Sequence, residues 1–282
     1  MVAIFRHTLS RFRGQILGWG ISMLVLGLLV VSLFDTVVAN QQQFEELIKA
    51  YPPEFSAFFG DLSTMATPEG FLSIEYFALA PVILGIFAVL AGSGLLASDE
   101  ENGTLDLILA HPVSRTALFI GRSLAFVAAT VGILALSWLG LVSAAAWSSL
   151  DIGWGALALP FLSLLAVLLD FGALALLLSM LLPSRRLAAA TAGITLVASY
   201  FLASLSRLNE DLETIANLTP LRYYQSGDAI QGLNVGWFVG LLAASALMVL
   251  LAWWRFERRD IRVAGEGGWR LSWPGVARPR RA

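Results

Sequence analysis

Cysteine is absent from this chain, and lysine and histidine are almost absent, with Lys49, His7 and His111 as the only examples. The lack of cysteine excludes disulfides, thiolate metal ligands and cysteine nucleophiles. A P-loop needs a lysine after its last glycine to reach the phosphates of a nucleotide, and no glycine-rich loop precedes Lys49. We therefore expect no Walker-type ATP site in the chain.

Charged residues are also scarce, at 13% of the chain against 57% hydrophobic residues, whereas a soluble domain carries about a quarter charged residues. Six apolar stretches are long enough to cross a bilayer, whose hydrocarbon core takes about 20 residues per helix. They lack the alternation of barrel strands, which favours helices. We predict an all-α, polytopic integral membrane protein with a single transmembrane domain (1–265), a basic tail (266–282) and spans at about 16–38, 77–97, 117–147, 156–182, 187–206 and 235–254.

Six spans place both termini on one side of the membrane, and the distribution of arginine identifies that side. If the termini are cytoplasmic, only Lys49, Arg207 and Arg222 lie outside. The other basic residues then lie in short inner loops, at span ends or in the tail, where the positive-inside rule is most reliable. The sequence therefore predicts a multi-pass protein of the cell membrane with both termini in the cytoplasm.

Residues 4–16 carry an amphipathic pattern ahead of the first span. Phe5, Leu9, Phe12 and Ile16 repeat at helical spacing, with basic and polar residues on the other face. We expect an N-terminal helix that lies in the cytoplasmic interface before the chain turns into the membrane. The alternative is that these residues are the start of the first span.

The last outer loop, 207–234, predicts short helices before the final span. Apolar residues from Leu208 to Leu218 repeat at helical spacing, and Pro220 separates them from a second short segment. We expect two short re-entrant helices that dip into the outer interface of the membrane.

One carboxylate, Asp170, falls in the middle of a span, in AVLLDFGALALL. A charge at mid-bilayer costs about 2.5 to 3.5 kcal/mol on insertion scales, so Asp170 must be protonated or must face the bundle or a watery cavity. It is a candidate for a transport pathway or a proton carrier, and equally for a hydrogen bond between helices. His7 and His111 both lie outside the spans, which argues against metal or haem ligation in the membrane and against Ser/His/Asp hydrolysis.

A charged and turn-rich stretch, SDEENGTLDLILAHPVSR at 98–115, separates the second and third spans. It predicts a short helix with an apolar ridge of Leu105, Ile108 and Leu109, ended by Pro112. Such a helix is shaped to fit a cleft in a partner, although a plain reverse turn would suit the same residues. Asn102 or Thr104 can cap this short helix, and Asp106 near its N-terminus suits the helix dipole. Ser114 can cap the third span, which Arg115 and Arg122 anchor at the inner interface of the membrane.

The same stretch resembles the cytoplasmic signature of the type-2 ATP-binding-cassette (ABC) exporter permeases. The residues that carry the resemblance are Glu101-Asn102-Gly103-Thr104-Leu105-Asp106, Leu107-Ile108-Leu109-Ala110 and Pro112-Val113-Ser114-Arg115. The layout of the chain is similar as well: an interfacial N-terminal helix, a Pro-rich Phe/Gly stretch in the first outer loop, six spans, a Pro/Tyr segment before the last span, and WWRFERRDI after it.

The resemblance implies that residues 103–110 form a coupling helix, which docks into a groove of a separate ATPase subunit. ATP and Mg²⁺ would be bound by that ATPase, so this chain would need no cofactor and would have no catalytic residues of its own. The resemblance also implies two permease copies, as a homodimer, with two ATPases. The residues implied in ATPase coupling are Glu101, Gly103, Thr104, Leu105, Asp106, Ile108, Leu109, Pro112 and Arg115.

The sequence therefore favours the permease subunit of an ABC exporter. We expect membrane lipids as a further partner, and we expect no nucleic acid partner. A non-transporting membrane scaffold or assembly factor is one alternative, and 98–115 would then be only a connector. A proton-coupled secondary transporter that uses Asp170 is the other.

Overall fold

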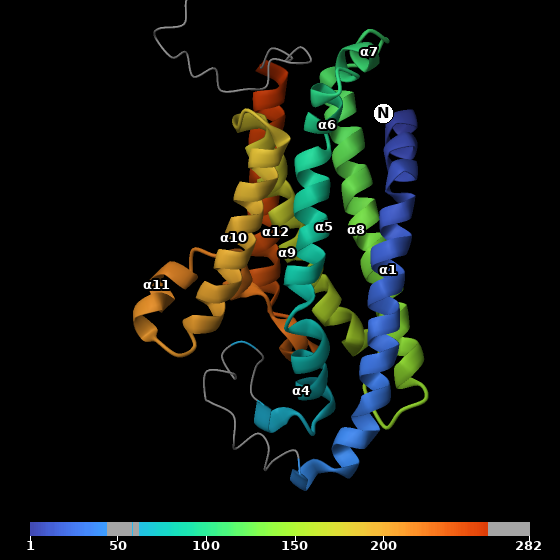
Figure 1. Cartoon of the computed structure of the whole chain (residues 1–282), viewed down its shortest axis with the longest axis vertical. Coiled ribbons are helices and arrows are strands. Elements are labelled where there is room, and N and C mark those ends of the chain that lie inside the picture. Colours follow the sequence, from blue (N-terminus) through green and yellow to red (C-terminus); the bar gives the residue numbers. More distant parts are fainter. Residues whose placement is uncertain (44–57, 59–61, 259–282) are drawn as a thin grey trace, which may run out of the picture.

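The protein, seen in a computed structural model that describes residues 1–43, 58 and 62–258, is a bundle of long helices (Figure 1). Six helical segments of the described chain are long and apolar enough to cross a membrane, at Val2–Ala39, Pro68–Gly94, Arg115–Ala145, Trp154–Leu181, Arg185–Leu205 and Val235–Arg258. No strand occurs among the described residues. The predicted all-α, six-span architecture is therefore confirmed.

The long helices are α1 (Val2–Ala39), α5 (Ala80–Gly94), α8 (Arg115–Ala145), α9 (Trp154–Leu181), α10 (Arg185–Leu205) and α12 (Val235–Arg258). Short helical turns connect them: η1 (Leu62–Thr64), α4 (Pro68–Leu72), η2 (Ser73–Phe77), α6 (Ala97–Glu101), α7 (Leu105–Leu109), η3 (Glu210–Leu212), α11 (Glu213–Ala216), η4 (Pro220–Tyr223) and η5 (Ser226–Gln231).

The structure differs from the expected layout at the N-terminus. Residues 4–16 do not form a separate interfacial helix, because α1 runs unbroken from Val2 to Ala39. Its predicted apolar face turns inward: Phe12 is buried and its ring meets that of Phe87 edge-on. No proline interrupts this stretch, and α1 packs along α8 over much of its length. The helix therefore continues through the residues that were expected to form a separate interfacial helix.

Helix α9 is the centre of the bundle, since α5, α8, α10 and α12 all pack against it. Its apolar residues face neighbours on every side, as in a buried helix. The closest approach is to α5, where a Cβ on Gly92 would collide with the backbone of Gly172. Glycine at position 92 therefore sets the distance between α5 and α9.

The segment before the last span consists of short helical turns, as predicted. The turns η3 and α11 precede Pro220, and η4 and η5 follow it. Leu208 and Ile215 are about half exposed and Leu218 is 85% exposed, so this segment presents an apolar surface. Most of the first outer loop, with its Pro-rich Phe/Gly stretch, lies outside the described residues.

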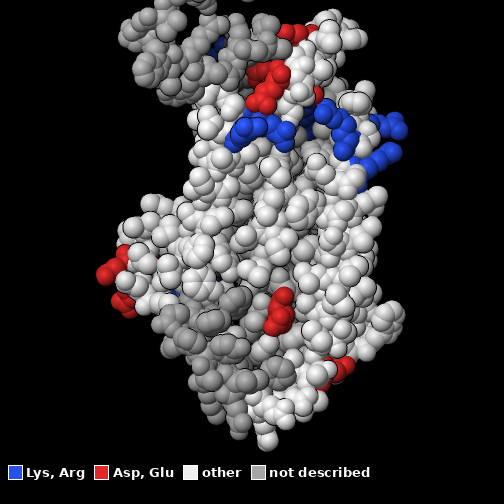
Figure 2. Space-filling model, in the orientation of Figure 1, with Lys and Arg blue, Asp and Glu red and all other residues white. Residues whose placement is uncertain are grey.

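The first residues of α1, the α6–α7 segment and the last residues of α12 lie at the same end of the bundle (Figure 1). Lys and Arg side chains gather in a band near this end on the face drawn in Figure 2, with acidic side chains beside them; most of the rest of that face is uncharged, with a few acidic side chains. The basic band marks the end that the sequence assigns to the cytoplasm.

The tight α5–α9 crossing predicts that Gly92→Ala destabilises the protein. The new methyl group would overlap the backbone of α9, and overpacking of this kind costs about 1–3 kcal/mol. Thermal unfolding of the purified protein in detergent would measure the loss. Gly18→Ala is the control, because a Cβ there has no neighbour within 4 Å; equal stability of the two variants would contradict the close crossing.

Candidate functional site

The α6 and α7 helices form a short helical hairpin at one end of the bundle. The turn between them depends on Gly103, whose φ of 69° lies in the left-handed region that favours glycine. The amide of Gly103 donates to the carbonyl of Glu100 (3.1 Å), and the amide of Thr104 donates to that of Asp99 (2.8 Å). These bonds close the end of α6 and set the direction in which α7 leaves.

The expected helix is present, but its apolar ridge faces the protein. Leu105 is 1% exposed within the core, and Ile108 and Leu109 pack against the core as partly buried residues. Leu107, on the other side of the helix, is 68% exposed. The ridge was expected to contact a partner; it instead holds α7 to the bundle, because a short helix on the end of a core buries its apolar face there.

The hairpin is held to the spans by a buried ion pair. Arg122 of α8 donates through Nη2 to Asp99 of α6 at 2.5 Å, and both residues are more than nine-tenths buried. Arg11 of α1 donates to the same carboxylate at 3.3 Å, and the hydroxyl of Thr104 donates to it at 3.2 Å. Asp99 therefore joins α6 to α1 and α8 and also fixes the start of α7.

The charges around Asp99 decide its ionisation. Burial acts to raise the pKa of its carboxyl group, but the guanidinium groups of Arg122 and Arg11 outweigh burial and hold the pKa below its ordinary value of 3.8. Asp99 is thus a carboxylate at neutral pH. The same Arg122 donates through Nη1 to the carbonyl of Leu95 (2.6 Å), which ties α8 to the chain just before α6.

Sequence reasoning missed this network, because Arg11, Asp99 and Arg122 are far apart in the chain. Arg122 was interpreted only as an anchor at the membrane boundary. A signal was available: Arg122 follows an apolar run within α8, and an arginine in such surroundings requires a buried partner.

Glu101 connects the hairpin to a third span. Its Oε1 accepts a hydrogen bond from the backbone amide of Arg185, the first residue of α10, at 2.7 Å. The hydroxyl of Ser184 accepts from the amide of Leu187 at the same helix end. A carboxylate at a helix N-terminus satisfies free amides and complements the helix dipole, so Glu101 stabilises the start of α10.

The chain after the hairpin is fixed as the sequence predicts. Ser114 caps α8 by accepting from the amide of Ala117 (3.1 Å), in the turn that also holds Pro112. Arg115 donates to the carbonyl of Phe256 (3.3 Å) near the end of α12. Beside it, Thr116 donates to Glu257 (2.6 Å), so the start of α8 is bonded to the end of α12.

The outward side of the hairpin is small and mixed in character. Asp106, Leu107, Ala110 and His111 are exposed there, in a patch that we call the α7 outer face. Its one large apolar side chain, Leu107, has acidic and polar neighbours. An exposed apolar residue on a fixed support, with charges around it, is suited to contact with another protein.

Asp170 lies apart from these residues, on α9. It is 2% exposed, and the hydroxyl of Ser245 on α12 donates to its Oδ1 at a long distance of 3.5 Å. The structure therefore places Asp170 between two helices, and does not bring it together with the predicted ATPase-coupling residues.

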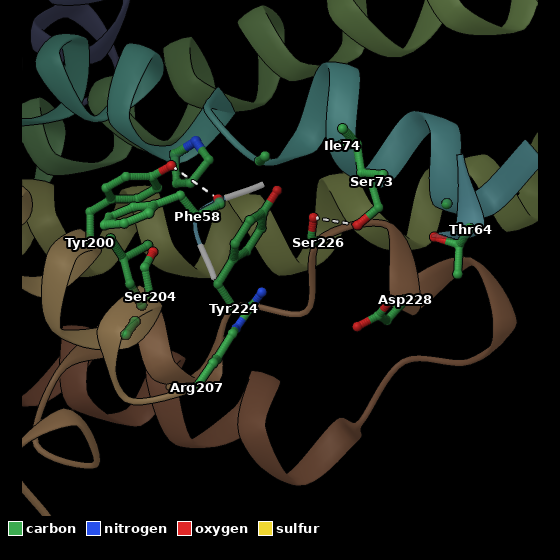
Figure 3. Close-up of a pocket in the computed structure, with 15 residues that line it drawn as sticks. Phe58, Thr64, Ser73, Ile74, Tyr200, Ser204, Arg207, Tyr224, Ser226 and Asp228 are labelled. Atoms are coloured by element: carbon green, nitrogen blue, oxygen red, sulfur yellow. Dashed lines mark hydrogen bonds between the residues drawn. The ribbon is translucent and has the colours of Figure 1, made fainter. Parts of the chain in front are cut away.

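A polar cavity of about 360 Å³ lies between η2, the end of α10 and the segment 221–228 (Figure 3). Its hydroxyl groups make hydrogen bonds across it: Ser73 with Ser226 (3.1 Å), Tyr200 to the carbonyl of Phe58 (3.2 Å), and Tyr224 to that of Phe77 (3.1 Å). These bonds join η2 to the segment 224–226 and α10 to Phe58, so the cavity serves the packing of this end of the bundle.

Six apolar spans, with α9 at their centre, and a helical hairpin held at the basic end define a multi-pass membrane protein. The chain matches the family model described as ABC-2 family transporter protein over residues 3–261. It therefore belongs to that family, as a transmembrane permease subunit of an ABC transporter. A comparison with curated proteins gave no match.

The buried network predicts that Arg122→Met destabilises the protein strongly. Removing one partner of a buried ion pair costs about 3–5 kcal/mol, because the remaining charge is left without its counter-ion. The double variant Arg122→Met with Asp99→Asn should recover part of that loss. Chemical or thermal unfolding in detergent would measure the stability of the unchanged protein, of Arg122→Met and of the double variant.

Asp106→Asn is the matched control for this network, since Asp106 is exposed on the neighbouring helix. Its stability should stay within about 0.5 kcal/mol of the unchanged protein. If Arg122→Met behaves like this control, the ion pair does not hold the hairpin.

Proposed function

We propose that this chain is the permease subunit of an ATP-driven exporter and that a separate ATPase subunit docks on the α7 outer face. The observation that carries the proposal is the support of α7. A helix of five residues (Leu105–Leu109) stands at the end of the bundle, is held there by Asp99 and Arg122, and exposes Leu107. A plain connector would need no such support.

The contacts of the hairpin suggest how force on α7 would reach the membrane. Asp99 is bonded to α8 and α1, and Glu101 is bonded to α10. A displacement of α7 would therefore move or strain three spans together, since packed helices and short ion pairs transmit rigid-body motion. Coupling of this kind requires two alternative arrangements of the bundle, which the ATPase would bias through α7.

The proposed complex contains two permeases, as a homodimer, and two ATPases, which bind ATP and Mg²⁺. Its α6–α7 end lies in the cytoplasm, and the basic band near this end supports that orientation. Leu105, Ile108 and Leu109 act as the internal side of the coupling helix, and Asp106 and Leu107 act as its contact side. This division follows from their burial and exposure.

The α7 outer face yields a binding test. Leu107→Asp should weaken co-purification with the ATPase encoded beside the permease by about tenfold or more, because burial of one leucine side chain contributes about 1.5–3 kcal/mol. The measurement is the ATPase-to-permease ratio after affinity purification from a membrane extract, together with ATP-dependent transport.

Leu208→Asp makes the same substitution at another exposed leucine outside the spans, and should leave the ratio unchanged. If Leu107→Asp retains both ATPase association and coupled transport, the docking proposal is wrong. The hairpin would then be a connector, as in a membrane scaffold.

Orientation is testable directly because the chain has no cysteine. Asp106→Cys on α7 and Trp147→Cys, which replaces an 83% exposed side chain between α8 and α9, provide one thiol each. A membrane-impermeant maleimide should label Trp147→Cys in whole cells and Asp106→Cys only in inverted vesicles. Labelling of Asp106→Cys from outside would place α7 out of reach of a cytoplasmic ATPase.

A further inference from the structure

A groove of about 570 Å³ lies between α9, α12 and the short turn η4. One wall comes from α12, where Gly236, Gly240 and Ala244 follow at intervals of four residues and leave the groove open. A Cβ on Gly240 would have no neighbour within 4 Å. Leucine and methionine account for half of the remaining lining residues: Leu174, Leu218, Leu241, Leu247 and Met248. The groove is therefore apolar.

One carboxyl group lines this groove. Asp170 is 2% exposed, and the hydrogen bond that it accepts comes from the hydroxyl of Ser245 at 3.5 Å. No lysine, arginine or histidine is among the described residues that line the groove. The arginine of η4, Arg222, is bonded to Glu213 (3.0 Å) and to Asn217 (3.3 Å). Asp170 thus presents a carboxyl group to the groove, and no described lining residue supplies a cation beside it.

Aromatic rings form another part of the lining. Tyr223 of η4 and Trp237 of α12 pack edge to face, with ring centroids 5.8 Å apart and an angle of 78°. The hydroxyl of Tyr223 donates to the carbonyl of Asn217 (2.7 Å), which holds the ring in place. The faces of tyrosine and tryptophan rings attract organic cations. The carboxyl group of Asp170 and the rings of Tyr223 and Trp237 therefore both favour a positive charge in a bound molecule.

A second groove on α12 provides a comparison. It has a smaller volume of about 330 Å³ and is lined by apolar residues and two serines, among them Phe126, Ala246 and Ser245. No acidic or basic residue lines it in the described part of the chain. Of these two grooves on α12, the one between α9, α12 and η4 therefore has an ionisable carboxyl group, that of Asp170, and the other has none among its described lining residues.

We propose that the groove between α9, α12 and η4 binds a lipophilic organic cation, with its apolar body against Leu241 and Met248 and its positive charge beside Asp170. A carboxylate in an apolar, membrane-facing groove is costly without a counter-charge, and a membrane-partitioned cation supplies that charge. The groove lies apart from the α6–α7 hairpin, so ligand binding does not rest on docking of the ATPase.

Binding of tetraphenylphosphonium to the purified full chain in lipid nanodiscs would test the proposal. This probe is a rigid, apolar monocation, and tetraphenylborate is an anion of nearly the same shape. We expect saturable binding of the cation and none of the anion at this site. Asp170→Asn should weaken cation binding by about tenfold or more, because loss of one partner of a buried charge pair is expensive. Equal binding of both probes would overturn the proposal, as would an unchanged affinity in Asp170→Asn.

Two further variants keep the test decisive if Asp170→Asn does not fold. Gly240→Leu adds a side chain to the groove at a position where a Cβ has no neighbour within 4 Å, and should weaken cation binding. Ala246→Leu makes a similar addition in the comparison groove, and should leave binding unchanged. If Ala246→Leu weakens binding and Gly240→Leu does not, the cation occupies the uncharged groove and the assignment to Asp170 is wrong. Cation binding is compared only between variants whose thermal stability matches that of the unchanged protein.

Discussion

The buried ion pair between Asp99 and Arg122 is the interaction on which the α6–α7 end of this protein depends. Removing two charges from water is expensive, and an apolar pair of similar volume would often be as stable. An apolar contact would, however, allow the hairpin to settle at several angles. The short bond of 2.5 Å, with Arg11 and Thr104 on the same carboxylate, specifies one position for α6 and α7. Directional contacts of this kind suit a part that must transmit movement.

The remaining contacts at this end extend the same constraint to the whole bundle. Glu101 binds the start of α10, and Arg115 and Thr116 bind the end of α12. Helix α9 packs against α5, α8, α10 and α12. In the proposed mechanism, a force on α7 would reach α1, α8 and α10 through these polar contacts, and α9 would respond through its packing. This order favours rotation of helices around a central one over local unfolding.

Much of the fold follows from the sequence, because the spans are a matter of length and apolar composition. The five later spans begin and end close to the predicted positions, with α5 ending at Gly94 and α6 taking over residues assigned to the span end. The N-terminus was harder: an amphipathic face suits both a membrane interface and a neighbouring helix. Only the contacts of α1 with α5 and α8 show that Phe12 faces protein.

The helix of the candidate site was predicted in position, but the side of it that faces outward was not. The helix, its glycine turn and the cap of the next span follow from local signals at Gly103, Pro112 and Ser114, which concern neighbours in sequence. Which side of α7 faces outward depends on where the core ends, and that is a property of the assembled bundle. The same limit applies to Arg122, since its partner Asp99 is brought to it only when α6 and α8 meet in the folded bundle.

Two buried aspartates of the described chain, Asp99 and Asp170, show how different surroundings assign different chemistry to one residue type. Asp99 is matched by two guanidinium groups and one hydroxyl, so its charge is already balanced by the protein and it contributes structure. Asp170 accepts a long hydrogen bond from a hydroxyl group and lines an open apolar groove. A balanced carboxylate has little attraction left for a ligand, whereas an unbalanced one gains by meeting a cation. Position along the membrane strengthens this contrast, because water screens charge near the end of the bundle and does not do so beside the middle of α9.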